Sequence, residues 1–591
     1  MKLRRKIFLI IIICNLSFLL HAQQKTYCNP INIDYGYTPI PNFTEWGRHR
    51  STADPVIVNY KGDYYLFSTN QWGYWWSSDM LNWNFISKKF LRPWNTDTYD
   101  ELCAPAVGII GDTMIVFGST YTSKFTLWMS TNPKANEWKP LVDSFAIGGW
   151  DPAFFTDDDG RLYMYNGSSN RYPLYGVELN RKTFQPIGTR KETYFLESWR
   201  FGWQRFGEYM DDTFLDGFIE GSWMTKHNGK YYLQYGAPGT EMSGYGDGVA
   251  VGNAPLDYFE NASDPMSFKP GGFARGAGHG ATFQDNTNNY WHVSTMGICV
   301  KNTFERRIGI WPTGFDKDDV MWCNTAFGDY PAFLPSPSGE GLGVRPDWFL
   351  LNYKKPMLVS STLGSYAANN ANDEDLKTYW SAASASKGEF IQTDLGNIST
   401  VNAIQINYAD QDVDWAAEDK KGGVFLGKSL GVFHQYKIYE SKDGKKWNVL
   451  VDKSNNKTDV PHDYIELEKP VQTRFIKVEN IHMPTGKFAI SGLRVFGNGN
   501  GAKPDKVKTF FVLRTEKDKR SGWIKWSPVD NAYAYNIYYG TAPDKLYNCI
   551  MVHQNNEYWF KGMDKLKTYY FTIEAVNENG VSERLETVKV E

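Results

Sequence analysis

The chain has 591 residues and a formal net charge of −3, and tryptophan, tyrosine and phenylalanine make up 16% of it. At roughly 100–200 residues per domain, this length predicts several domains. The small net charge provides no global basic field that would favour nucleic acid. Abundant aromatic residues and glycines, with almost no long apolar helical periodicity, predict an all-β protein.

The N-terminus reads MKLRRKIFLIIIICNLSFLLHAQ, with a basic start, an apolar run and a small residue before Gln23. This pattern is typical of a secretory signal peptide. We expect cleavage after Ala22 and a secreted or periplasmic protein. Cys14 lacks the small preceding residues of a lipoprotein site, so a lipid anchor is the weaker interpretation. No later segment has the roughly 20 apolar residues that a transmembrane helix needs.

Five cysteines follow the signal peptide: Cys28, Cys103, Cys299, Cys323 and Cys549. Their number is odd, their spacings are wide, and no CxxC pair indicates structural zinc. A Cys299–Cys323 disulfide is one alternative in an oxidising compartment. Free, buried cysteines are the default that we expect.

Five stretches between about residues 50 and 320 share one layout. Each has a small residue or proline near its start, then a short strand, a polar turn and an aromatic or apolar strand. They are DPVIVNYKGDYYLFST, APAVGIIGDTMIVFGST, DPAFFTDDDGRLYMYNGSS, EGSWMTKHNGKYYLQYG and GHGATFQDNTNNYWHVSTM. Their starts lie about 45–70 residues apart, the spacing of propeller blades that are each a four-stranded sheet. The repeat predicts a five-bladed β-propeller.

The residues that begin the five stretches include three carboxylates and one imidazole: Asp54, Ala104, Asp151, Glu220 and His279. If each begins the inner strand of its blade, the propeller's symmetry brings them to one end of the central channel. Close, partly buried carboxylates raise one another's pKa. A protonated acid beside an ionised base is suited to hydrolysis of a glycosidic bond. Taken singly, each residue would be interpreted as a turn or structural residue, and only their common phase favours a site.

These motifs make residues 25 to 325 similar to family 43 of the glycoside hydrolases and to the wider family 43/62 clan. The resemblance of ADPVIV implies that Asp54 is the general base. WDPAFFTDDDG implies that Asp151 orients the acid and tunes its pKa, and EGSWMTKHNGKYYLQYG implies that Glu220 is the general acid. The family chemistry implied here inverts the anomeric configuration and requires no cofactor. An inverting acid and base lie about 6.5–9.5 Å apart.

The same resemblance implies further site residues. GAGHGATF places His279 where many members bind a hydrated calcium or sodium ion on the propeller axis. RRIGIWPTGFD places Arg306 where the family keeps a sugar-binding arginine, and Arg307 is the alternative. We also expect substrate contacts from three tryptophans, Trp72, Trp150 and Trp203.

The segment KETYFLESWRFGWQRFGEYMDDTFLDGF separates the third and fourth stretches. It contains rival acids that we interpret as loop charges, namely Glu208, Asp211, Asp212 and Asp216. A further hypothesis is that this segment walls the pocket, with Trp199 and Trp203 near the sugar. Enlarged loops before blades one and four predict a closed pocket and exo action.

The rest of the chain resembles two further β-sandwich domains. Residues 355 to 497 are similar to a discoidin-type, family 32 carbohydrate-binding domain with a jelly-roll fold. There, Asn372, Asp373 and Asp375 predict either a structural calcium site or a capped loop without metal. After the linker NGNGAKPDK, the sequence resembles a fibronectin type III domain, with Trp526 as its core tryptophan and Tyr569 as its corner tyrosine. We expect this last domain to be a spacer.

The predicted organisation is a signal peptide over 1–22, a propeller over 23–350, a discoidin-type domain over 351–499 and a fibronectin type III domain over 500–591. We predict a monomeric exo-glycoside hydrolase that acts on side chains of plant-type glycans, with α-L-arabinofuranosidase favoured. β-Xylosidase, galactosidase and galactofuranosidase are alternatives. A non-catalytic glycan-binding propeller is the alternative of another class. The retaining invertase and levanase clan is disfavoured, because STADPVIV lacks its W-x-N-D-P-N-G pattern.

Overall fold

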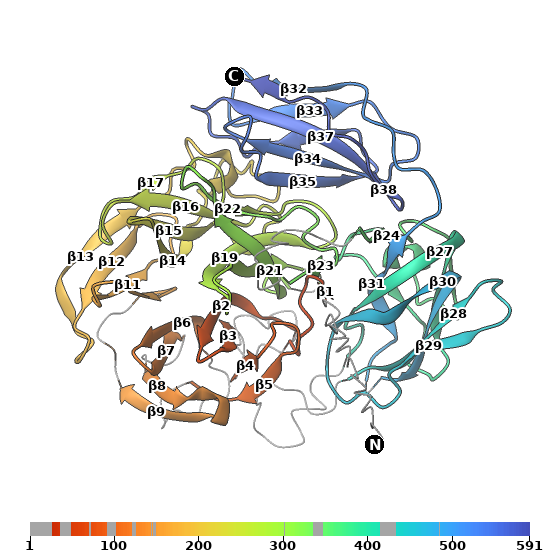
Figure 1. Cartoon of the computed structure of the whole chain (residues 1–591), viewed down its shortest axis with the longest axis horizontal. Helices are drawn as coiled ribbons and strands as arrows, with labels where there is room; N and C mark the ends of the chain where they lie inside the picture. Colours follow the sequence, from red (N-terminus) through yellow and green to blue (C-terminus); the bar gives the residue numbers. More distant parts are fainter. Residues whose placement is uncertain are drawn as a thin grey trace, which may run out of the picture.

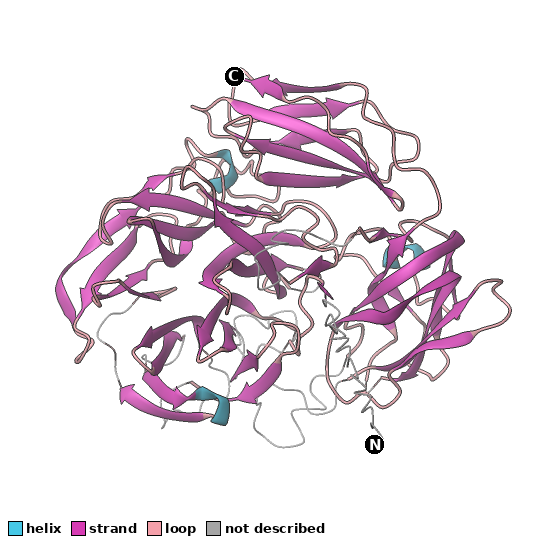
Figure 2. Ribbon diagram, viewed as in Figure 1, coloured by secondary structure: helices cyan, strands magenta, loops and turns pink. Residues whose placement is uncertain are grey.

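The computed structural model describes residues 26–35, 49–69, 73–90, 102–120, 126–143, 145, 149–298, 300, 302–334, 347–413, 433–483 and 485–591. These residues form a propeller and two sandwich domains that pack against it (Figures 1 and 2). Strands dominate throughout, and the only helical turns in the described ranges are short 3₁₀ turns at Pro133–Ala135, Gly202–Gln204 and Ala368–Ala371. The all-β prediction is confirmed. Within the described ranges, no helix has the length and apolarity to cross a membrane.

The first three blades of the propeller are four-stranded antiparallel sheets in simple sequence order. Blade one contains β2 (Ala53–Tyr60), β3 (Asp63–Thr69), β4 (Gly73–Ser77) and β5 (Asn84–Ser87). Blade two contains β6 (Cys103–Ile110), β7 (Thr113–Ser119), β8 (Leu127–Asn132) and β9 (Glu137–Val142). Blade three contains β10 (Ala153–Thr156), β11 (Leu162–Asn166), β12 (Leu174–Leu179) and β13 (Pro186–Tyr194).

The last two blades follow the same order. Blade four contains β14 (Glu220–His227), β15 (Lys230–Ala237) and β16 (Gly246–Gly252), with the short β17 (Glu260–Asn261) and β18 (Ser267–Phe268) on β16. Blade five contains β19 (Arg275–Gln284), β20 (Tyr290–Gly297), β21 (Arg306–Phe315) and β22 (Met321–Cys323). Each innermost strand contacts the next around the ring, and β19 returns to β2. The predicted five-bladed propeller is therefore present and closed.

Each inner strand is entered through a residue in the left-handed region of backbone space. These residues are Asp54 (φ 50°), Ala104 (φ 43°), Asp151 (φ 55°), Gly221 (φ 65°) and His279 (φ 46°). Such a conformation costs an ordinary L-residue about 1–2 kcal/mol, so its recurrence marks a feature that the fold enforces. In four blades, the residue that begins the repeated stretch is the left-handed residue. In blade four the position assigned from the sequence is wrong by one residue, because Gly221 is left-handed and Glu220, which begins the stretch, precedes it.

The second domain is one large antiparallel sheet system on one side of the propeller (Figure 1). Its main path runs through β24 (Phe349–Leu350), β31 (Ala489–Asn498), β27 (Phe390–Tyr408), β30 (His462–His482), β28 (Gln435–Ser441) and β29 (Asn448–Asp452). The short strands β25 (Met357–Val359) and β26 (Trp380–Ser381) pair with β27 and β31. Since β24 pairs with β31, this sheet begins two residues before the predicted boundary at 351.

The third domain is a sandwich of two sheets. One contains β32 (Phe510–Arg514), β33 (Gly522–Trp526) and β36 (Glu557–Phe560). The other contains β35 (Asn548–His553), β34 (Ala534–Gly540), β37 (Tyr569–Asn577), β38 (Gly580–Val581) and β39 (Val588–Val590). Trp526 is buried between them, and the Tyr569 hydroxyl accepts a hydrogen bond from the Asp564 amide at 2.7 Å. The fibronectin type III assignment stays a prediction.

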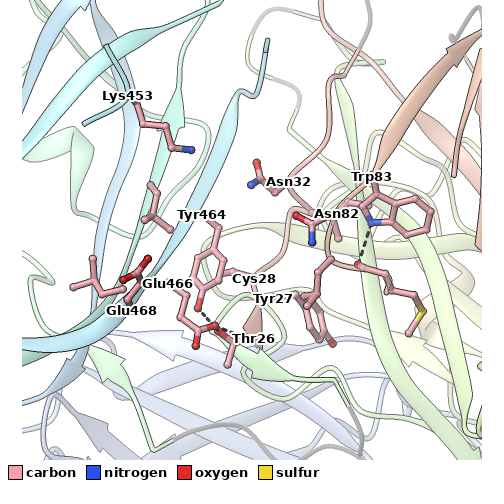
Figure 3. Close-up of a pocket in the computed structure, with 15 residues that line it drawn as sticks. Thr26, Tyr27, Cys28, Asn32, Asn82, Trp83, Lys453, Tyr464, Glu466 and Glu468 are labelled. Atoms are coloured by element: carbon pink, nitrogen blue, oxygen red, sulfur yellow. Dashed lines mark hydrogen bonds between the residues drawn. The ribbon is translucent and has the colours of Figure 1, made fainter. Parts of the chain in front are cut away.

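The N-terminal segment links the propeller to the second domain. Strand β1 (Thr26–Tyr27) pairs with β23 (Ala332–Phe333), and the Thr26 amide donates to Glu466 of β30 at 2.7 Å. Figure 3 shows these groups at the floor of a cleft of about 340 Å³, with Trp83 of blade one on its far side. None of the carboxylates predicted to be catalytic lines this cleft.

The third domain packs onto the segment between β13 and β14. Arg200 pairs with Asp564 at 2.9 Å, and the Gly202 amide donates to the Met563 carbonyl at 3.0 Å. Trp203 of this segment is fully buried in one apolar core that propeller and sandwich residues share. The segment therefore forms part of the interface with the third domain, whereas the sequence had suggested that it walls the pocket.

Candidate active site

The residues that enter the inner strands bring Asp54, Asp151, Glu220 and His279 together. Nδ1 of His279 lies 3.2 Å from Oδ1 of Asp54 and 3.9 Å from Oδ2 of Asp151. Ligand-type atoms of Asp151, Glu220 and His279 all lie within 4.8 Å of one another. The prediction that symmetry gathers three carboxylates and an imidazole agrees with this geometry.

The left-handed residues are anchored by the preceding blade. The Asp54 amide donates to the Thr295 hydroxyl of β20 at 2.8 Å, and the Asp151 amide donates to the Ser119 hydroxyl of β7 at 3.2 Å. Each bond satisfies a buried donor and fixes the backbone from which the carboxylate projects. The positions of both carboxylates are thus set by neighbouring blades.

Two hydroxyl groups hold the Glu220 side chain. The Tyr245 hydroxyl donates to Oε1 at 2.5 Å, and the Ser168 hydroxyl donates to Oε2 at 3.3 Å. Tyr245 lies just before β16, and Ser168 follows β11. Ser168 also bonds to Asp151, as does the Gly221 amide. One serine therefore connects the two neighbouring acids.

Asp54 is buried in a positively charged environment. Burial alone would raise its pKa, but His279 and Arg306 outweigh that effect and hold the Asp54 pKa below its usual value. Nη1 of Arg306 lies 3.6 Å from Oδ1 of Asp54. Asp54 therefore stays ionised at neutral pH, as a general base must.

Asp151 and Glu220 have the opposite character. Burial is the largest cause of a raised pKa for both groups. The Asp151 charge adds to the rise at Glu220, and the Asp54 charge adds to the rise at Asp151, against the opposing pull of His279. Because the two carboxyls share one site, their titration belongs to the pair. The arrangement favours one retained proton, which a general acid requires.

His279 lies against the backbone of blade four. A Cβ added to Gly221 would sit 2.4 Å from the His279 ring. Burial would lower the His279 pKa, but the surrounding carboxylates, Asp54 first, raise it overall. The raised pKa favours the charged imidazolium form of the ring beside Asp54.

The axial ion site predicted at His279 can be judged only from the side-chain atoms that could ligate an ion there. Asp151, Glu220 and His279 offer two carboxylates and one nitrogen, whereas calcium takes six to eight oxygens. Water would have to supply most ligands. The buried Oδ2 of Asp151 has no hydrogen-bond partner, which leaves one acceptor for such a shell. The ion stays a prediction, and no catalytic step below depends on it.

The two candidate arginines lie in different environments. Arg306 contacts Asp54 and donates to the Thr240 hydroxyl at 3.3 Å, and its buried Nε has no hydrogen-bond partner. Arg307 instead donates to His462 of the second domain at 2.7 Å. Arg306 therefore lies at the catalytic cluster and Arg307 at the second domain, and the sugar contact of Arg306 stays a prediction.

The three predicted tryptophan contacts have different outcomes. Trp150 lies beside Asp151 with 38% of its surface exposed. Trp203 is 0% exposed and stacks on Tyr235 with ring centroids 5.9 Å apart, so the prediction that it contacts sugar is wrong. Trp72 lies outside the described residues.

The rival acids have structural partners instead. Glu208 accepts the Ser243 amide at 2.9 Å and lies 3.6 Å from Lys377 of the second domain. Asp212 accepts the Phe214 amide at 2.7 Å, and Asp211 pairs with Lys561. Asp216 is exposed. These contacts agree with their interpretation as loop charges.

Sequence reasoning missed Tyr245, Ser168 and Thr240. Tyr245 and Thr240 lie in a loop outside the repeated motif, in GTEMSGYGDG, whereas Ser168 lies at the end of the third repeated stretch, in YNGSS. No spacing signal identifies the two loop residues, because each acts through the spatial position of its loop. The second strand of each blade ends near the inner-strand entry of the next blade, and this would have been the only guide to Ser168.

The predicted calcium loop of the second domain is a hydrogen-bonded turn. The Asp375 amide and the Thr378 hydroxyl donate to Asp373 at 3.0 and 2.7 Å. The amide nitrogen of Asn372 donates to the carbonyls of Asn352 and Lys355, while its buried Oδ1 has no partner. Both alternatives, calcium site and capped loop, stay predictions.

The four cysteines in the described ranges are buried, and Cys28, Cys323 and Cys549 are free. Cys323 therefore does not carry the disulfide considered with Cys299, which itself lies outside the described residues. The default prediction is confirmed for these three.

Comparisons with protein families agree with this geometry. Residues 49–321 match the model of glycosyl hydrolases family 43, and residues 370–478 match that of the NedA-like, galactose-binding domain. Residues 49–321 thus form a family 43 glycosyl hydrolase domain, and a galactose-binding-type domain follows it.

Curated relatives cover shorter stretches. A β-D-galactofuranosidase (xynD) of Aspergillus niger is 28% identical over 159 residues, which cover 26% of this chain and 40% of the relative. A β-xylosidase of Xylanibacter ruminicola is 27% identical over 168 residues, covering 25% and 50%. The chain thus spans half or less of the length of these relatives. A solved glycoside hydrolase structure aligns over 78% of this chain and 99% of its own, with 18% identity and a TM-score of 0.43.

Proposed function

We propose that the protein is a secreted, exo-acting glycoside hydrolase that inverts the anomeric configuration. The observation that carries this proposal is the opposite tuning of two buried carboxyls in one cluster. His279 and Arg306 lower the Asp54 pKa, whereas burial and Asp151 raise that of Glu220. Hydrolysis of a glycosidic bond requires one carboxyl group that stays ionised, as the base, and one that stays protonated, as the acid.

The roles follow from the contacts. Glu220 protonates the leaving oxygen, while Asp54 removes a proton from water that attacks the anomeric carbon. Asp151 keeps Glu220 protonated by charge repulsion and, through Ser168, keeps it oriented. Arg306 lies 3.6 Å from Asp54 and stabilises its negative charge.

The substrate that we favour is a terminal α-L-arabinofuranosyl residue on a plant-type glycan. The names of the curated relatives support including β-xylosides and β-D-galactofuranosides beside it. The experiment is a product profile on nitrophenyl glycosides of these three sugars, followed by pectin, arabinogalactan and arabinoxylan fragments. Release of one monosaccharide from chain ends is expected.

Asp54→Asn is the companion variant. The amide has almost the same shape but cannot accept a proton from water, and general-base catalysis contributes about 10²–10⁴-fold. The variant should therefore lose at least about 100-fold in kcat while it stays folded and binds ligand. Asp216→Asn is the control. Activity of Asp54→Asn within threefold of the wild type would exclude its role, and glycan binding without turnover by the wild type would favour a binding protein.

A further inference from the structure

A surface groove of about 360 Å³ lies over blade three, and it is lined by residues adjacent to the catalytic cluster. Trp150, Ser168, Tyr172, Tyr175 and Arg190 line it, together with the glycines and asparagine beside them. These residues come from the entry to β10, from the β11–β12 connection and from β12 and β13. The volume lies within the range of small-ligand pockets, about 300–1,000 Å³.

One residue of the groove contacts the predicted acid. Ser168, which lines it, donates to Oε2 of Glu220 at 3.3 Å. The neighbouring Ser169 pairs through its backbone with Ile219, the residue before Glu220. Oε1 of Glu220 faces the Tyr245 hydroxyl, which belongs to a fully buried residue, whereas Oε2 faces Ser168 at the groove. The leaving oxygen must approach that atom, so the leaving group extends toward the groove.

The groove presents aromatic rings to solvent. Tyr172 is 67% exposed and Trp150 is 38% exposed, so both rings have surface that a ligand in the groove can contact. The Arg190 guanidinium lies 3.7 Å from the centroid of the Tyr175 ring and holds that ring by a cation–π contact. Flat, partly fixed rings with polar tips suit pyranose and furanose faces, which combine C–H patches with hydroxyls.

We propose that this groove binds the leaving-group side of an oligosaccharide substrate, that is, the sugars that follow the terminal residue removed by the enzyme. The proposal deepens the hydrolase function above and rests on it. It names the substrate class as an oligosaccharide that extends beyond the terminal sugar, and it makes Tyr172 and Tyr175 specificity-determining residues. Short aryl glycosides do not reach the groove.

The test compares Tyr172→Ala with Tyr258→Ala, which removes another exposed ring (58% exposed) outside the groove. Each variant is assayed on a nitrophenyl glycoside and on an oligosaccharide of three or more sugars. Tyr172→Ala should lower kcat/KM about tenfold on the oligosaccharide, mainly through KM, and leave the aryl glycoside within twofold. A tenfold loss corresponds to about 1.4 kcal/mol, the upper part of the range for an aromatic contact. Tyr258→Ala should change neither.

Equal losses on both substrates, or no loss on the oligosaccharide, would overturn the proposal. A second measurement separates it from the hydrolase function. Binding of the oligosaccharide to Glu220→Gln, measured by calorimetry, should weaken about tenfold when Tyr172→Ala is added. If the wild type hydrolyses nothing yet this weakening occurs, the hydrolase proposal fails and the groove stands. If turnover is normal and binding is unchanged, the groove proposal alone fails.

Discussion

The Tyr245 hydroxyl donates to Oε1 of Glu220 at 2.5 Å, so a residue outside the repeated motif holds the predicted acid. Its loop is tied in turn by Glu208, which accepts the Ser243 amide at 2.9 Å. Thr240 of the same loop contacts Arg306. One loop therefore positions both the acid and the arginine beside the base.

Tyr245→Phe should raise the pKa of Glu220. A donor to an ionised carboxylate stabilises the charged form and lowers its pKa, so removing that donor moves the pKa upward. Because Glu220 must be protonated to act, the alkaline limb of the pH–kcat/KM profile should move to higher pH. The pH profile on a natural glycan measures this. An unmoved limb, or one displaced to lower pH, would exclude the Tyr245 contact.

Asp151→Asn should shift the same limb the other way. The Asp151 charge raises the Glu220 pKa, so the neutral amide should let Glu220 lose its proton at lower pH. As pH rises, the variant should therefore lose activity at a lower pH than the wild type. The variant should be milder on nitrophenyl glycosides, whose leaving groups need little protonation. Opposite shifts for Asp151→Asn and Tyr245→Phe are the expected signature, and parallel shifts would contradict the assigned roles.

Glu208→Ala should loosen the loop that carries Tyr245. The Ser243 amide loses its acceptor, and hydrogen exchange of a peptide over 238–246 should accelerate on the full chain. Asp216→Asn, in the same segment, should leave exchange unchanged. The double variant Glu208→Ala/Tyr245→Phe should show little further loss of kcat on natural substrate beyond Tyr245→Phe, since both act through one contact. Fully additive losses would show that Glu208 acts elsewhere.

Gly221→Ala tests the left-handed entry of blade four. The new Cβ would meet the His279 ring at 2.4 Å, in a backbone conformation that costs alanine about 1 kcal/mol or more. We expect a lower thermal midpoint and a loss of kcat of at least tenfold, because His279 must move from Asp54. Gly229→Ala is the matched control, with a similar φ and open space around its Cβ. Equal behaviour of the two variants would contradict the packing of His279 on Gly221.

The propeller and most of the cluster could be predicted from the sequence. Residues at equivalent positions of the repeat lie at equivalent positions around the propeller axis, because the blades are related by symmetry. Asp54, Asp151 and His279 follow that rule. Glu220 was placed one residue out of phase, because the sequence does not reveal that glycine takes the left-handed position in blade four. Tyr245 could not be predicted, because its loop lies outside the repeat. Ser168 lies at the end of the third repeated stretch, but the repeat does not show that its hydroxyl reaches Glu220. Trp203 was misassigned because the docking of the third domain, which buries it, leaves no local pattern.

The stereochemistry of the first product tests the central claim most directly. Once the glycan panel has identified a cleaved linkage, proton NMR during the first turnovers shows the anomeric configuration of the released sugar before mutarotation. If Asp54 activates water while Glu220 protonates the opposite side of the bond, the first sugar released has the inverted configuration. Retention of configuration would mean that a carboxylate attacks the sugar directly, and it would contradict the roles assigned to Asp54 and Glu220.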